Sequence, residues 1–226
     1  HGAFGFSQGL LLNNIVDTGL RDSDDGTQSG NTVGDVMSGA LGDPGGRSPM
    51  IRYDTPRVGG FAAAVSHEYA GHASFGATYG GSVGPLKVSI KTGYHNGDGD
   101  ANNVLGVSGA IKHSSGLGGG YAYTFSMDGV ESTVTADQDV HQQAAQVFYQ
   151  AKFNEMGSTT FMGEWQQARD LSITGSEGNA FSVGLSQNVD SAAISFYAKY
   201  IHVDVKAPGE NFDDVQAVDT GIRMKF

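Results

Sequence analysis

The sequence predicts an all-β protein, a transmembrane antiparallel β-barrel of about twelve strands that forms one domain over residues 1–226. Three observations predict this fold: apolar and polar residues alternate with period two, the alternating segments are long enough to cross a bilayer, and short connections alternate with long ones. No helix-length stretch keeps an apolar stripe of period 3.6. The absence of cysteine excludes a disulfide scaffold and thiol chemistry.

The alternating segments are the predicted strands. In the last of them, Phe226, Met224 and Ile222 share one face, whereas Lys225 and Arg223 lie on the other. Each segment is close to the ~9–11 residues that a tilted strand needs to cross a membrane. The predicted ranges are 3–12, 48–57, 59–69, 73–81, 85–95, 103–114, 119–127, 141–154, 158–168, 180–189, 192–203 and 215–226.

The connections between these strands differ in length from one end of the barrel to the other. Tight turns rich in Gly, Asn, Asp and Ser are predicted at 57–59, 81–84, 115–118, 155–157 and 188–191. Longer polar connections start at Asn96, Asp128, Arg169 and Asp204, and the longest covers 13–47. A soluble β-sandwich has no reason to sort its loops by length, whereas an outer-membrane barrel has short periplasmic turns and longer external loops. Loop sorting therefore favours the barrel.

The charge of the chain restricts its partners. Its formal net charge of −11 disfavours nucleic acid and biases any water-filled interior toward cations. No run of about eighteen apolar residues predicts a transmembrane helix, but a membrane β-barrel needs none. The chain begins at His1 without a charged and then apolar leader, so we interpret it as a mature form, a processed form or a fragment.

Two motifs resemble those of Gram-negative general diffusion porins. They are the segment SPMIRYDTPRVGGFAAAVSHEYAG, from Ser48 to Gly71, and the ending VDTGIRMKF. The resemblance implies an outer-membrane channel that passes small hydrophilic solutes and ions by diffusion, without catalysis. It also implies a homotrimer surrounded by lipid and lipopolysaccharide. The terminal Phe226 would be the signal that the barrel assembly machinery reads.

The resemblance also implies a role for the longest connection. In these porins the corresponding loop folds back into the barrel and narrows the pore, and here the range 13–47 occupies its place. Carboxylates in a narrow, partly dehydrated passage raise the local concentration of cations, which predicts a weak cation preference. The family's aromatic-Gly-Gly loop tip is missing, so the residue at the narrowest point stays open. The predicted constriction residues are Asp17, Asp22, Asp24, Asp25, Asp35 and Asp43.

The family barrel has sixteen strands, and two alternatives follow for this chain. Either about twelve strands close on themselves, or four further strands belong to another piece, because an open barrel would leave unpaired edges in hydrocarbon.

Alternation also predicts a positive wall that faces the acidic loop. For Arg223 and Lys225 an alternative fits equally well, in which their charged side-chain ends reach the lipid headgroups. The predicted wall residues are Arg52, Lys87, Lys91, Lys112, Lys152 and Lys199.

Three other interpretations compete with the channel. The seven histidines show no His-x-x-x-His spacing, which disfavours zinc. A phospholipase-like outer-membrane enzyme needs Ser, His and Asn, and only His95 and Asn96 lie close together in sequence. A soluble secreted β-sandwich binding module would have a polar outer face. No cofactor is predicted, except that Asp98 and Asp100 form a weak calcium candidate in a Gly- and Asn-rich loop.

Overall fold

The structure is a computed structural model that describes residues 17–37, 49–69, 71–96, 103–127, 140–170 and 173–224. Nearly all of its regular structure is antiparallel β-sheet, as predicted. The elements are β1 (Gly19–Arg21), β2 (Gln28–Thr32), α1 (Val33–Met37), β3 (Met50–Asp54), β4 (Phe61–Glu68), β5 (Ala73–Val83), β6 (Leu86–Asn96), β7 (Asn103–His113), β8 (Leu117–Met127), β9 (Val140–Asn154), β10 (Gly157–Arg169), β11 (Glu177–Val189), the 3₁₀ turn η2 (Asp190–Ala192), β12 (Ile194–Ala207), β13 (Glu210–Asn211) and β14 (Val215–Met224).

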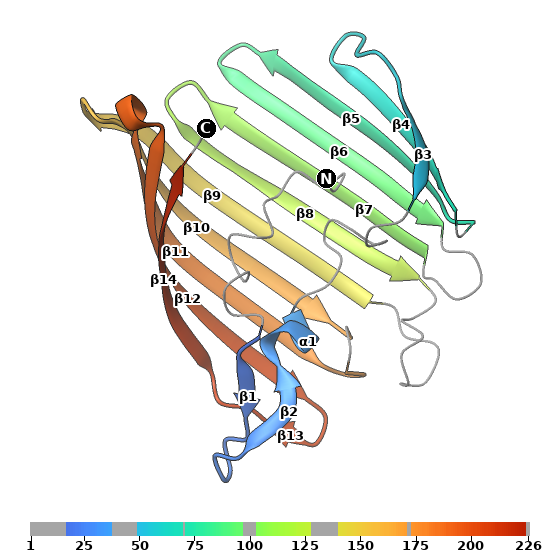
Figure 1. The fold of residues 1–226 in the computed structure, drawn as a ribbon, viewed down its shortest axis with the longest axis vertical. Helices are drawn as coiled ribbons and strands as arrows, with labels where there is room; N and C mark the ends of the chain where they lie inside the picture. The colour runs from blue at the N-terminus through green and yellow to red at the C-terminus, as the bar shows by residue number, and fades with distance from the viewer. Residues whose placement is uncertain are drawn as a thin grey trace.

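One 12-stranded sheet contains every strand from β3 to β14, and β1 and β2 form a separate hairpin. Each strand from β3 to β12 pairs with its neighbours in sequence, and β14 pairs with β12. The sheet curves around the face on which α1 packs (Figure 1). Within the described residues no ladder joins β3 to β14, so closure of the barrel is not seen.

The two faces of the sheet differ in chemistry, because successive side chains of a strand point to opposite sides. The face that carries the cross-strand neighbours Trp165, Phe181 and His202 is called the outer face. The face that carries Glu164, Ser182 and Ile201 is called the inner face. Apolar side chains cover the outer face and are exposed there. They include Phe61, Val65, Phe75, Ile90, Leu105, Val107, Phe161, Val183, Leu185, Phe196, Tyr200 and Ile222.

The inner face is mainly polar, with buried Ser66, Ser108, Thr124, Gln142 and Ser182. An exposed apolar outer face costs free energy in water and is stable in hydrocarbon, so this arrangement is that of a membrane barrel rather than a soluble sandwich. No helix among the described residues is long and apolar enough to span a membrane.

The strands have a turn end and a loop end. Short connections at 84–85, 114–116, 155–156 and 190–193 join them at the turn end. Aromatic rings gather on the outer face there: the centroids of Phe61 and Tyr79 are 4.6 Å apart, and those of Phe153 and Phe161 are 6.1 Å apart. Tyr79 suits a membrane–water boundary because its ring is apolar and its hydroxyl is polar, and the phenylalanine rings add apolar surface beside the boundary. The predicted sorting of short turns to one end is therefore present.

The predicted strand ranges needed three corrections. The strand predicted at 48–57 is shorter, as β3 spans only Met50–Asp54, and the strands of β10, β11 and β12 continue farther toward the loop end than the pattern indicated. The short elements β1, β2, α1 and β13 were not predicted, because tertiary contacts rather than local pattern stabilise them. The strand predicted at 3–12 lies outside the described residues.

Candidate pore lining and pore loop

Strand alternation places the predicted basic residues on the inner face. Lys87 of β6 is directly opposite Lys112 of β7, and Lys91 lies four residues farther along β6 on the same face, opposite Ser108. Arg52 and Lys199 lie on the same face of β3 and β12. Arg52 forms an ion pair of 2.7 Å with Asp54 on its own strand. Lys87, Lys91 and Lys112 thus share two adjacent strands, whereas Arg52 and Lys199 lie apart from them on β3 and β12.

The middle of the inner wall holds a buried ion pair. The Lys199 ammonium lies 3.3 Å from the Asp219 carboxylate, and the two side chains are only 6% and 10% exposed. They are direct cross-strand partners on β12 and β14. The buried Glu164 carboxylate, on the same face of β10, accepts a hydrogen bond of 3.3 Å from the Ser182 hydroxyl. Removing one partner of such a pair leaves an uncompensated buried charge.

A chain of polar side chains crosses the inner wall near the turn end. Lys112 donates to the Oε1 atom of Gln150, whose amide donates to Thr160 at 3.1 Å. Farther along, Asn188 donates to the Ser158 hydroxyl at 2.7 Å. The Lys112 ammonium is therefore held by a neutral acceptor, which leaves its charge uncompensated. The exposed Lys152, on the same side of β9, instead lies 3.5 Å from the Asp190 carboxylate.

Residues 17–37, which we call the pore-loop segment, pack on the inner face at the loop end of β10, β11 and β12 (Figure 1). Their contact is apolar. The buried cluster contains Leu20, Val33, Val36 and Met37 from the segment and Ala168, Ala180, Ile201, Val203 and Val205 from the wall. Small wall residues make room for it: a Cβ added at Gly178 would collide with the Met37 sulfur and lie 3.1 Å from Val36.

Hydrogen bonds fix the segment in two further places. At its end, the Gln166 side chain donates to the Met37 carbonyl at 3.1 Å. At its hairpin, the Ser23 amide donates to the Asn211 carbonyl and the Asp213 amide donates to the Arg21 carbonyl, both at 2.9 Å. The pore-loop segment is therefore held between the inner wall and the connection from β12 to β14, which includes β13.

The predicted constriction carboxylates do not gather at one point. Asp22, Asp24 and Asp25 lie in the turn between β1 and β2, where the hairpin extends past the sheet (Figure 1). Asp35 caps α1 by accepting hydrogen bonds from the Thr32 amide and hydroxyl at 2.7 and 2.8 Å. Asp17 is exposed at the start of the described segment. Asp43, Asp98, Asp100 and Phe226 lie outside the described residues.

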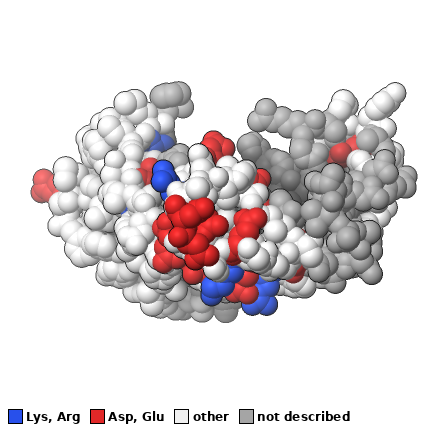
Figure 2. All heavy atoms as spheres, turned by 90° about the horizontal axis from the view of Figure 1, so that it is seen from below, with Lys and Arg blue, Asp and Glu red and all other residues white. Residues whose placement is uncertain are grey.

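Acidic side chains gather where the molecule is viewed from the loop end (Figure 2). The hairpin turn contributes Asp22, Asp24 and Asp25, and the adjoining 210–214 segment contributes Glu210, Asp213 and Asp214. Within the turn, the Thr27 hydroxyl and amide donate to Asp25 at 2.7 and 2.8 Å, and these bonds lower the pKa of that exposed carboxyl. The Asp25 carboxylate is thus held in its charged form at the loop end.

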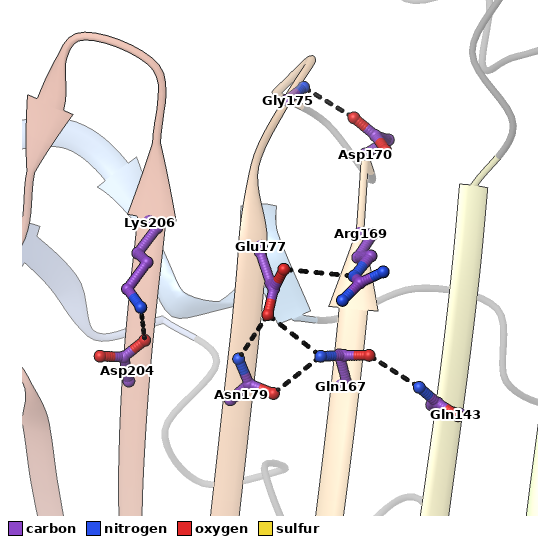
Figure 3. Close-up of polar contacts among 9 residues, drawn as sticks. All are labelled: Gln143, Gln167, Arg169, Asp170, Gly175, Glu177, Asn179, Asp204 and Lys206. Carbon is purple, nitrogen blue, oxygen red and sulfur yellow. Dashed lines mark hydrogen bonds and ion pairs between the residues drawn. The ribbon is translucent and has the colours of Figure 1, made fainter.

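The outer face becomes polar near the loop end. Gln143 donates to Gln167 at 2.7 Å, and Gln167 and Asn179 both donate to Glu177 (Figure 3). Arg169 approaches Glu177 to 3.2 Å, which completes a chain over three neighbouring strands. On β12, Lys206 lies 3.8 Å from Asp204. We call these seven residues the outer polar belt. The predicted strands stopped short of Arg169, Glu177, Asn179, Asp204 and Lys206, because the face that is apolar elsewhere along these strands becomes polar here.

A Ser–His contact on the inner face bears on the enzyme alternative. The Ser74 hydroxyl lies 2.9 Å from Nδ1 of His95, a pair that sequence spacing did not reveal because strand pairing brings it together. The two are direct cross-strand partners on β5 and β6, so ladder geometry accounts for their contact. Within the described ranges, no group of three His, Asp or Glu side chains could hold a metal ion.

Comparison with solved structures agrees with this architecture. An anion-selective porin from Comamonas acidovorans matches with a TM-score of 0.53 and 15% identity over 96% of this chain. This chain spans 66% of the length of that porin. OmpT of Vibrio cholerae matches with a TM-score of 0.47 and 13% identity over 76% of this chain and 62% of its own. A search of curated proteins found no match.

The fold and its two faces define a membrane protein of the β-barrel class with a polar interior. The sequence matches the family described as Gram-negative porin over residues 12–222, so the chain belongs to that family. The family places it in the outer membrane of a Gram-negative bacterium.

Proposed function

We propose that this chain forms a water-filled channel through which small hydrophilic solutes and ions diffuse passively across the outer membrane. The observation that carries the proposal is the pairing of an apolar outer face with a polar inner face against which an internal segment packs. In this orientation the turn end faces the periplasm and the loop end faces outward. The docked segment reduces the cross-section of the channel near its outer mouth.

The channel prefers cations weakly in this proposal. Carboxylates crowd the loop end, where solutes enter, and the described constriction candidates there are Asp17, Asp22, Asp24, Asp25 and Asp35. The wall residues Arg52, Lys87, Lys91, Lys112, Lys152 and Lys199 oppose this bias from the inner face. A field at the entrance concentrates cations because the low-dielectric wall weakens screening.

Solute flux and ionic selectivity test the two parts separately. Liposomes that contain the purified protein should swell in neutral sugars, faster for small sugars than for large ones, and absence of swelling would contradict the channel. Under a salt gradient, the reversal potential should have cationic sign. The triple substitution Asp22→Asn, Asp24→Asn and Asp25→Asn should move it toward zero, and an unchanged potential would contradict the role of the hairpin acids.

We also propose a homotrimer. An apolar hollow of ~390 Å³ lies on the outer face of β3 to β6, where small Ala63 and Ala77 are surrounded by Tyr53, Phe75 and Tyr94. A neighbouring copy can approach closely at such a hollow. Substituting Ala77→Trp should shift the detergent-extracted protein from trimer to monomer in analytical ultracentrifugation. A trimer that is unaffected would contradict this placement.

Two partners follow from the same proposal. Arg169 and Lys206 of the outer polar belt lie where phosphate groups of lipopolysaccharide can reach them, and Phe226 serves the barrel assembly machinery. Deleting Phe226 should lower the amount of folded protein in the outer membrane. Replacing Arg169 and Lys206 by Gln should lower the lipopolysaccharide that co-purifies, without changing conductance.

A further inference from the structure

The turn end of the inner wall carries charges that the proposed cation preference does not use. Lys87 is the second residue of β6 and Lys112 is the second last residue of β7, so both lie beside the turn end. They are direct cross-strand partners and share the inner face. Like charges placed opposite each other destabilise a sheet, so this pair costs stability unless an anion lies between them.

Nothing in the described part of the chain neutralises this pair. No carboxylate there lies within ion-pair distance of Lys87, Lys91 or Lys112. Lys112 is held by Gln150, and the Gln150 amide is held in turn by Thr160. The Lys112 ammonium is therefore oriented by neutral groups, and the exposed Lys87 side chain can move toward a ligand.

The position of the pair contrasts with that of the acids. Carboxylates crowd the loop end (Figure 2), whereas described carboxylates at the turn end are Glu155 and Asp190, in the turns next to β9 and β12. Asp190 lies 3.5 Å from Lys152. Positive charge therefore dominates the wall at the turn end of β6 and β7, whereas negative charge dominates the loop end.

We propose that Lys87 and Lys112, with Lys91 farther along β6, form an anion-binding site at the turn-end mouth. It binds small multivalent anions such as organic phosphates and polycarboxylates, because two ammonium groups on adjacent strands can contact separate oxygens of one ligand. This inference rests on the proposed channel. It adds that an anion binds the inner wall from the turn side, although the outer mouth favours cations.

Sided block of single channels tests the proposal. Tripolyphosphate is added first to one chamber and then to the other while one wild-type channel conducts in a planar bilayer. Block should be strong from a single chamber only. Each of Lys87→Gln and Lys112→Gln should raise the blocking concentration by about two- to fivefold, as an exposed charge pair contributes a factor of that order. Gln216→Glu makes the same charge change on the exposed outer face of β14 and should leave block unchanged.

The absence of cysteine permits a rescue experiment. In Lys87→Cys, modification with a trimethylammonium thiosulfonate should restore block, whereas modification with a sulfonate reagent should not. Equal block from both chambers, or block that is insensitive to both substitutions, would overturn the site while leaving the conducting channel intact. Calorimetric titration of the detergent-folded protein with tripolyphosphate measures the site without conduction. If the protein never conducts but binds tripolyphosphate, and the variant that combines Lys87→Gln with Lys112→Gln loses this binding, the result would support the site and refute the channel.

Discussion

Truncating Met37 should release the pore-loop segment from the wall. The side chain is fully buried among Val36, Ala168 and Ala180, and its carbonyl accepts the Gln166 hydrogen bond. A buried Met→Ala change costs about 2–5 kcal/mol through lost transfer free energy and the cavity that remains. Because the segment is a separate hairpin and short helix on the sheet, we expect most of this cost to affect its docking rather than the sheet.

Trypsin cleavage after Arg21 measures the docking equilibrium. Arg21 lies in β1, and its carbonyl accepts the Asp213 amide, so cleavage requires the segment to open. When opening is fast, the cleavage rate follows the open population, and 2–5 kcal/mol corresponds to an increase of about 30- to 5,000-fold. The protein is held in lipid vesicles, and mass spectrometry identifies the fragment that ends at Arg21.

Met224→Ala provides the matched control. This residue is 60% exposed on the outer face of β14, so the same truncation there should leave cleavage after Arg21 within about threefold of the wild type. If Met37→Ala also changed cleavage by less than threefold, the apolar cluster would not be what holds the segment. Equal acceleration by both variants would instead indicate general loosening of the sheet.

Three further predictions address the wall and the hairpin. Lys199→Met removes the ammonium that pairs with the buried Asp219 carboxylate and should cost about 3–5 kcal/mol, seen as a lower urea midpoint for the vesicle-embedded protein. Lys152→Met, in an exposed pair, should cost less than about 1 kcal/mol, and equal effects would refute the distinction. Gly178→Val should collide with Met37 and Val36 and accelerate cleavage after Arg21 as Met37→Ala does, whereas unchanged cleavage would contradict the packing. Thr27→Val should raise the pKa of Asp25 toward its ordinary value in an NMR titration, and an unchanged titration would be inconsistent with the Thr27 bonds. Because the pKa of Asp25 is lower in the folded protein, its contribution to the stability of the turn is present above the ordinary carboxylate pKa. That contribution is lost as the pH falls through the folded pKa.

The transmembrane strands could be predicted because the bilayer imposes a strict rule on them. A side chain that faces lipid must be apolar, so apolar and polar residues alternate throughout β4 to β8. The same alternation assigns Lys87, Lys112 and Lys199 to the inner face. The outer polar belt broke the rule, since Gln167 and Asp204 put polar groups on the outer face, and the ends of β10 and β12 were missed.

The pore-loop segment could be predicted only as a connection. The elements β1, β2 and α1 are too short for a periodic pattern, and they are held by contacts with residues more than a hundred positions away, such as Gln166 with Met37. One signal was present in the sequence: Ala168, Gly178 and Ala180 leave space on the inner faces of adjacent strands. Small residues in register on a polar wall indicate where another segment packs.

Single-channel conductance in a planar bilayer tests the central claim most directly. The detergent-purified full chain should insert and give stable, stepwise openings, in groups of three for a trimer, with larger and noisier steps for Met37→Ala because its pore-loop segment detaches. A protein that inserts stably and never conducts would contradict a water-filled channel in this chain.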